Sequence, residues 1–158
     1  MNVLAEERAI ARVLTEYCYL IDLDQVDRLI PEVFDPEATG DYGFGEMSAP
    51  EMVAMISRLH GNFEALGHFL SNVTVDVDPS GDRAKSKSYV TAWHWLKETS
   101  GKGRMRPAEF VAVGIYEDQF VRRGTAWRII RRTTLPIGGV VGIGRMPDNV
   151  VGISGVKA

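Results

Sequence analysis

The sequence predicts one α+β domain in which three helices come first and a sheet of long antiparallel strands follows. Two observations support this order. Apolar residues recur at steps of three and four in the N-terminal part, whereas residues 67–135 hold extended runs separated by short turns that contain Gly or Pro. The 158 residues suffice for one domain with a substantial core.

Two helices are expected at the start of the chain. Residues 3–21 place apolar side chains on one helical face, namely Ile10, Val13, Leu14, Tyr17, Cys18 and Ile21. A shorter helix is expected over about residues 25–31, with Asp24 as its N-cap and its end at Pro31 or soon after. Charged side chains on the opposite face of residues 3–21 indicate that this helix has one side in the core.

Turn and cap signals divide the next segment. The run of residues 35–40 (Asp-Pro-Glu-Ala-Thr-Gly) predicts a turn that leads into a short strand around Tyr42. Ser48, followed by an early proline and by Glu51, predicts the start of a third helix that ends near Gly61.

Four strands are expected after that helix, over residues 67–77, 84–97, 108–121 and 126–135. From Pro136 onward the chain alternates Gly with Val and Ile, and we expect this tail to be loosely ordered or dependent on a partner. The predicted organisation is a domain over residues 1–135 and a tail over residues 136–158.

Composition narrows the classes of function. A net charge of −3 offers no basic field for nucleic acid and no polybasic patch for a membrane, so neither is expected as a partner. The single cysteine, Cys18, excludes an intrachain disulfide. The sequence has no signal-peptide run and no membrane-spanning run, which predicts a cytoplasmic protein. It also has no nucleotide, phosphate or metalloprotease fingerprint, so we expect no cofactor and no metal.

Asp22 and His68 are the first candidate site residues. Asp22 lies four residues after Cys18, so helical geometry aims its carboxylate along the apolar face, which is costly without a partner. A turn or cap role is the alternative for Asp22. Strand alternation places His68 with Leu70, Asn72 and Thr74, and puts Phe69, Val73, Val75 and Val77 on the other face. That pattern alone favours a structural or surface position for His68.

Other candidates lie on the later strands. His94 shares a face with apolar residues, which is more typical of a core histidine than of a catalyst. Arg131 and Arg132 point to opposite faces, so one of them projects inward. Among the aromatic residues, Trp93 is a candidate for binding a substrate. Its strand face is also a candidate surface for self-association, with Tyr89, Thr91, Trp93 and Trp95.

The order of elements and several short motifs resemble the SnoaL-like branch of the nuclear-transport-factor-2-like superfamily over about residues 5–135. The motifs are Ala9-Ile10, residues 22–29 (Asp-Leu-Asp-Gln-Val-Asp-Arg-Leu), residues 33–38 (Val-Phe-Asp-Pro-Glu-Ala), residues 67–72 (Gly-His-Phe-Leu-Ser-Asn) and residues 124–129 (Gly-Thr-Ala-Trp-Arg-Ile). The resemblance implies a cone-shaped fold, with the three N-terminal helices packed in a strongly curved antiparallel sheet. It also implies a homo-dimer or homo-trimer.

The family includes scytalone dehydratase, hexachlorocyclohexane dehydrochlorinase and bile-acid 7α-dehydratase, and the resemblance implies roles for five residues. Asp22 and His68 match the family's catalytic dyad, in which the imidazole is the base and the carboxylate orients it. Tyr17 stands in the place of a tyrosine of the bile-acid dehydratase. His94 resembles the second histidine of scytalone dehydratase, and Arg132 matches the pocket arginine of the dehydrochlorinase. The resemblance implies an acid or a cation at the leaving group, roles that would fall to Tyr17 or His94, and to Arg132.

The resemblance predicts a cofactor-independent lyase, a dehydratase or related β-elimination enzyme, that acts on an apolar aromatic or polycyclic small molecule. Tyr42 falls near the family's pocket aromatic and is a second substrate-binding candidate. One alternative is an isomerase of the ketosteroid type, which would use a lone Asp as base. Another is a non-catalytic ligand-binding or assembly module of the same fold. Two ionisable groups aimed into one cavity favour the enzyme.

Overall fold

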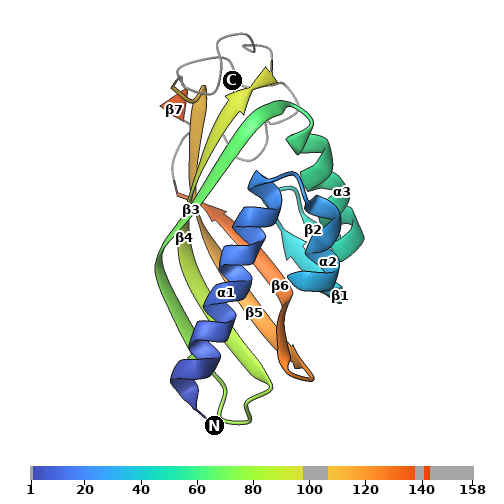
Figure 1. Cartoon of the computed structure of the whole chain (residues 1–158), viewed down its shortest axis with the longest axis vertical. Helices are drawn as coiled ribbons and strands as arrows, with labels where there is room; N and C mark the ends of the chain where they lie inside the picture. The colour runs from blue at the N-terminus through green and yellow to red at the C-terminus, as the bar shows by residue number, and fades with distance from the viewer. Residues whose placement is uncertain (1, 98–106, 138–140, 143–158) are drawn as a thin grey trace.

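The structure is a computed structural model that describes residues 2–97, 107–137 and 141–142. Helices pack on one side of a long, curved sheet (Figure 1), so the α+β class and the helix-first order are confirmed. The elements in chain order are α1 (Val3–Asp22), the 3-10 helix η1 (Val26–Arg28), α2 (Leu29–Glu32), β1 (Phe34–Asp41), β2 (Glu46–Ser48), α3 (Ala49–His60), β3 (Phe63–Val77), β4 (Arg83–Leu96), β5 (Phe110–Arg123), β6 (Ala126–Pro136) and β7 (Val141–Gly142).

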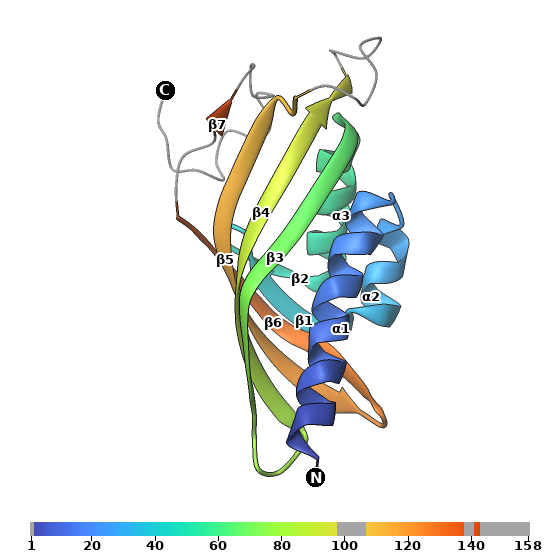
Figure 2. The same cartoon turned by 60° about the vertical axis from the view of Figure 1, so that its left-hand side comes forward.

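The sheet has the strand order β2-β1-β6-β5-β4-β3, and β7 pairs with β5. Its edges do not meet, so the sheet curves around the helices without closing into a barrel (Figure 2). Neighbouring strands are antiparallel except β1 and β6, which are parallel. The predicted antiparallel sheet is therefore correct for every pairing except that of β1 with β6.

Caps and apolar stripes account for the two longer helices. Asn2 caps α1, because its side-chain oxygen accepts a hydrogen bond from the Ala5 amide. Six apolar residues of α1 are buried, namely Ile10, Leu14, Tyr17, Cys18, Leu20 and Ile21. Helix α3 begins with a capping box, in which Glu51 accepts hydrogen bonds from the backbone N–H and the hydroxyl of Ser48. The predicted start and end of α3 are confirmed.

Asp24 is not the N-cap that the sequence predicts. It has a φ of 57° and follows α1 in the left-handed conformation that often ends a helix. The Asp24 amide donates to the carbonyl of Ile21, and the Gln25 amide donates to that of Leu20, which together form a Schellman motif. The helix expected over residues 25–31 is instead the short pair η1 and α2, without a side-chain cap at either start.

Residues 35–40 belong to strand β1 and do not form the predicted turn. The Asp-Pro sequence still disturbs the ladder, because pairing with β6 passes from Phe34–Ile129 directly to Thr39–Arg131. The Asp35 side chain is buried and accepts hydrogen bonds from the Glu37 amide and from Arg123. These contacts hold an irregular strand where local sequence favours a turn.

A bulge in β3 corrects the predicted alternation. Pairing with β4 shifts between Ser71 and Thr74, and Asn72 has a φ of 51°. The bulge moves the inward-facing set by one residue, so Val75 and Val77 pack against the same core as Leu66 and Leu70. The prediction that Val75 and Val77 lie on the face opposite His68 was therefore wrong.

The predicted tail begins within an ordered strand. Strand β6 continues to Pro136, and Val141–Gly142 pairs with β5. The rest of the tail, residues 138–140 and 143–158, lies outside the described residues. Among the helices that the structure describes, none has the length and apolar character needed to span a membrane.

Candidate functional site

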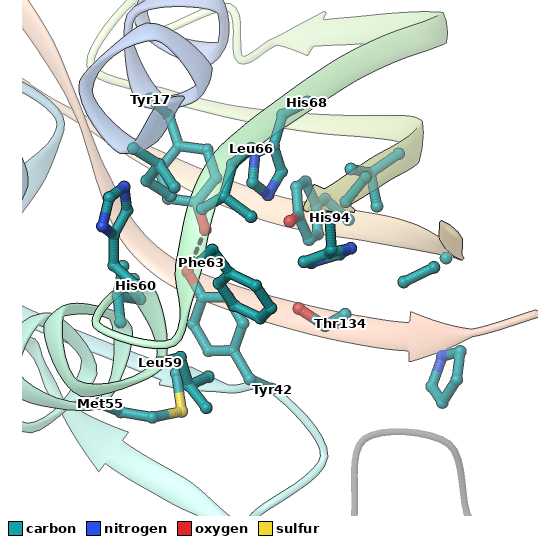
Figure 3. Close-up of a pocket in the computed structure, with 18 of the residues that line it drawn as sticks. Tyr17, Tyr42, Met55, Leu59, His60, Phe63, Leu66, His68, His94 and Thr134 are labelled. Atoms are coloured by element: carbon teal, nitrogen blue, oxygen red, sulfur yellow. Dashed lines mark hydrogen bonds between the residues drawn. The ribbon is translucent and has the colours of Figure 1, made fainter. Parts of the chain in front are cut away.

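A cavity of about 150 Å³ lies between the helices and the inner face of the sheet. An engineered apolar cavity of roughly 150 Å³ holds one benzene ring, so this space can hold a single ring. Side chains from α1, α3 and strands β3 to β6 form its wall (Figure 3), and the apolar ones include Ile21, Met55, Leu59, Phe63, Leu66 and Val90.

Asp22 and His68 meet at the edge of this cavity. Asp22 is the last residue of α1, and its Oδ1 lies 2.6 Å from Nδ1 of His68 on β3. The second carboxylate oxygen accepts a hydrogen bond of 2.9 Å from the His68 backbone N–H. A neutral imidazole in this contact donates its Nδ1–H to the carboxylate, which leaves the lone pair on Nε2. The predicted contact between Asp22 and His68 is thus present, with the imidazole projecting into the cavity (Figure 3).

The hydroxyls of Tyr17 and Tyr42 lie 3.0 Å apart at the cavity wall (Figure 3). Burial raises the pKa of both phenols well above the usual value, so both stay protonated at neutral pH. In such a pair one O–H donates to the other oxygen, and Tyr17 has a further side-chain hydrogen bond with Tyr116, which also lines the cavity. The structure therefore places both predicted tyrosines at the same cavity as the dyad.

His94 also lines the cavity, 6.4 Å from His68 between ring centroids. Its ring stacks on Phe110 at 4.1 Å. Burial, with a further effect from His68, lowers the pKa of His94 to about 3, so the ring is neutral at physiological pH. The expectation that His94 acts as an acid needs correction, because a neutral ring can exchange hydrogen bonds but has no extra proton to give. Its Nδ1 has no hydrogen-bond partner in the part of the chain that the structure describes.

Arg132 does not line the cavity, contrary to its expected place beside a leaving group. It is fully buried and forms two hydrogen bonds to Asp118, of 2.7 and 2.8 Å. Its guanidinium lies 4.0 Å from the ring centroid of Tyr17 and 4.2 Å from that of Tyr116. Arg132 therefore supports the tyrosines from behind. Arg131, on the other face, pairs with Glu46 at 2.7 Å.

Trp93 is not at the cavity either, so its substrate-binding assignment is wrong. It lies on the outer face of β4, where 40% of its surface is exposed, and its ring stacks on that of Trp95. Alternation along β4 turns His94 inward and its neighbours outward. Trp93 could not both bind a substrate in the cavity and contribute to a self-association surface, because these lie on opposite faces of the sheet. Its position on the outer face is compatible only with self-association.

His60, Tyr116 and Thr134 are among the cavity residues that sequence reasoning missed. His60 is the last residue of α3, and its Nδ1 lies 3.2 Å from Oδ1 of Asp24. A helical periodicity that ends at Leu59 gave no signal for His60, whose place depends on the turn after α1. Across residues 2–97, 107–137 and 141–142, no group of three or more His, Cys, Asp or Glu side chains is placed to hold a metal ion.

The open α+β cone is the fold of the SnoaL-like branch of nuclear-transport-factor-2-like proteins. The profile of the SnoaL-like domain matches residues 2–133, and the chain belongs to this family. An uncharacterized protein of Mycobacterium tuberculosis is 32% identical over 132 residues, which cover 82% of this chain and 84% of that protein.

Two solved structures show the same fold. One is a candidate scytalone dehydratase from Novosphingobium aromaticivorans, 23% identical with a TM-score of 0.70, covering 91% of this chain and 97% of that one. The other is a hexachlorocyclohexane dehydrochlorinase from Novosphingobium barchaimii, 18% identical with a TM-score of 0.66, covering 91% of this chain and 96% of that one. At these identities the likeness establishes the fold, so the reaction has to be argued from the site.

Proposed function

We propose that this chain is a cofactor-independent lyase that removes a β-leaving group, such as water, from a small apolar ring compound. The observation that carries the proposal is the 2.6 Å contact between Asp22 and Nδ1 of His68 at the wall of an apolar cavity. A base that is held by a carboxylate through one ring nitrogen and can take a proton on the other is the minimum that a β-elimination needs.

The proposed reaction begins when Nε2 of His68 takes a proton from the carbon next to an activating carbonyl. The electron pair of that C–H bond forms the new C=C bond as the C–O bond breaks. The leaving hydroxide takes up the proton from the imidazolium and departs as water, so the ring returns to its neutral form. Asp22 holds Nδ1–H throughout and stabilises the transient cation.

The tyrosine pair suits a second task in this reaction. Together with Tyr116 the pair forms a cluster of three hydroxyls at the cavity, and one O–H of this cluster can donate to an oxygen on which negative charge develops. Because burial keeps the pKa of both phenols high, they act by hydrogen bonding and keep their protons. His94, neutral at the same pH, can add a hydrogen bond.

The test uses 4-hydroxy-4-phenylbutan-2-one, a single-ring β-hydroxy ketone whose dehydration gives a conjugated enone that absorbs in the near ultraviolet. Wild type should catalyse this dehydration with or without a chelator. His68→Ala should lose about 10²–10⁴-fold in kcat, since the proton acceptor is gone. Asp22→Asn should lose much of the rate too, while Asp27→Asn, the same change at a nearby exposed position, should keep it.

Undiminished turnover by His68→Ala, or loss of activity with chelator, would contradict the proposal. If wild type binds the ketone without converting it, and also leaves hexachlorocyclohexane unchanged, the result would favour the alternative of a non-catalytic ligand-binding module.

A further inference from the structure

The cavity contains a second histidine–carboxylate pair, His60 with Asp24. Nδ1 of His60 lies 3.2 Å from Oδ1 of Asp24, and only 12% of the His60 side chain is exposed. In the view of Figure 3 the His60 ring lies on the helical side of the cavity, with the contact between Tyr17 and Tyr42 between it and His94. Each pair takes its carboxylate from the end of α1, but Asp22 holds a ring of β3 and Asp24 a ring of α3.

The fold holds His60 with one ring nitrogen outward and one inward. Asp24 is 72% exposed, so Nδ1 faces a hydrated carboxylate. Nε2 is buried, and no hydrogen-bond partner for it exists among the described residues. The simplest alternative is a helix-end contact that only stabilises the turn, since Asp tolerates a positive φ. That alternative explains Nδ1 but leaves the buried Nε2 without a function.

Two further polar atoms of the cavity wall are also buried without a hydrogen-bond partner among the described residues. These atoms are Nδ1 of His94 and Oγ1 of Thr134. A ligand with no hydrogen-bonding group would displace water from these atoms and leave them unpaired. Such a mismatch typically weakens binding by about 5- to 100-fold for each atom. The cavity therefore suits an apolar ring that carries polar substituents.

We infer that His60, oriented by Asp24, is a binding subsite for a hydroxyl group, and that the substrate is a hydroxylated ring compound and not a halogenated hydrocarbon. With Nδ1–H donating to the carboxylate, Nε2 of the neutral ring accepts a hydrogen bond from the ligand O–H. The inference rests on the proposed function only in treating this cavity as the substrate pocket.

The test compares phenol with toluene, two single rings of similar size that differ in one hydroxyl. The affinities of both ligands are measured by NMR titration under the same conditions. In His60→Leu, phenol should bind about tenfold or more weakly, while toluene should stay within about threefold of wild type. Phenol should also shift the imidazole nitrogen signals of His60 in wild type more than toluene does.

Asp24→Gly provides a second variant, because glycine suits the φ of 57° and keeps the turn while the carboxylate is removed. It should weaken phenol binding in the same direction and spare toluene, and it carries the test if His60→Leu does not fold. Unchanged phenol affinity in both variants, or equal losses for the two ligands, would overturn the subsite. Phenol is not turned over, so this result does not depend on whether the chain catalyses elimination.

Discussion

Replacing Arg132 by methionine should destabilise the fold severely, although Arg132 lies outside the cavity. Arg132 and Asp118 both have side chains with 0% exposure, and two hydrogen bonds join them. Removing the guanidinium strands a carboxylate in the core, which typically costs about 3–5 kcal/mol. Loss of the stacking on Tyr17 and Tyr116 favours the upper part of that range. A domain is commonly stable by only about 5–15 kcal/mol, so most of the margin would be gone.

The assay is urea unfolding of wild type, Arg132→Met and the double variant Arg132→Met with Asp118→Leu. The double variant leaves no unpaired charge and should regain at least about 2 kcal/mol over the single variant. It should also keep most of the elimination activity, because neither residue lines the cavity. A single variant that loses less than about 1 kcal/mol, or a double variant as unstable as the single one, would refute this structural role. A double variant that folds but has lost the elimination activity would show that Arg132 or Asp118 contributes to the reaction.

Three further predictions concern pH, packing and assembly. The pKa of His94 is about 3 in the folded chain against 6.5 unfolded, so the unfolded state binds a proton first and stability falls as pH drops below about 6.5. Between pH 7 and 5 this amounts to about 2 kcal/mol, and His94→Phe should show a flatter pH dependence in thermal melts. Gly40→Ala should cost about 1–3 kcal/mol in urea, because its Cβ would collide with the buried Met52 sulfur; a neutral effect would show that the core yields there. We also propose that the exposed Phe69 and Trp93 form part of a dimer or trimer interface, so light scattering should report an oligomer that Phe69→Glu weakens, and a wild-type monomer would contradict this.

Local signals in the sequence were sufficient where neighbouring residues decide the structure. The capping box of Ser48 and Glu51 marks the start of α3, and apolar spacing marks the buried face of α1. Both depend on contacts within a few residues, which a sequence displays directly. The inward aim of Asp22 followed from the same periodicity, because it ends the stripe that begins at Ile10.

Features that depend on contacts between residues far apart in the chain could not be predicted from the sequence pattern. Strand β1 keeps its extended form because Arg123 pairs with the buried Asp35, a contact between residues far apart in the chain. The bulge at Asn72 reverses the alternation of β3, and no single residue type announces it. The choice between Arg131 and Arg132 depended on where Asp118 lies across the strand pair. The place of His60 at the cavity depends on the Schellman turn at Asp24. The sequence did not predict this turn, because Asp is also a common N-cap residue and Asp24 was assigned that role.

The central claim is that His68, held by Asp22, removes a proton from carbon in this cavity. The most direct measurement is proton exchange with D₂O at the carbon next to the carbonyl of 4-phenylbutan-2-one, followed by NMR. This ketone has no leaving group, so exchange reports the base alone. We predict exchange catalysed by wild type and a loss of about 10²–10⁴-fold in His68→Ala. Exchange that proceeds equally well in His68→Ala would contradict the claim.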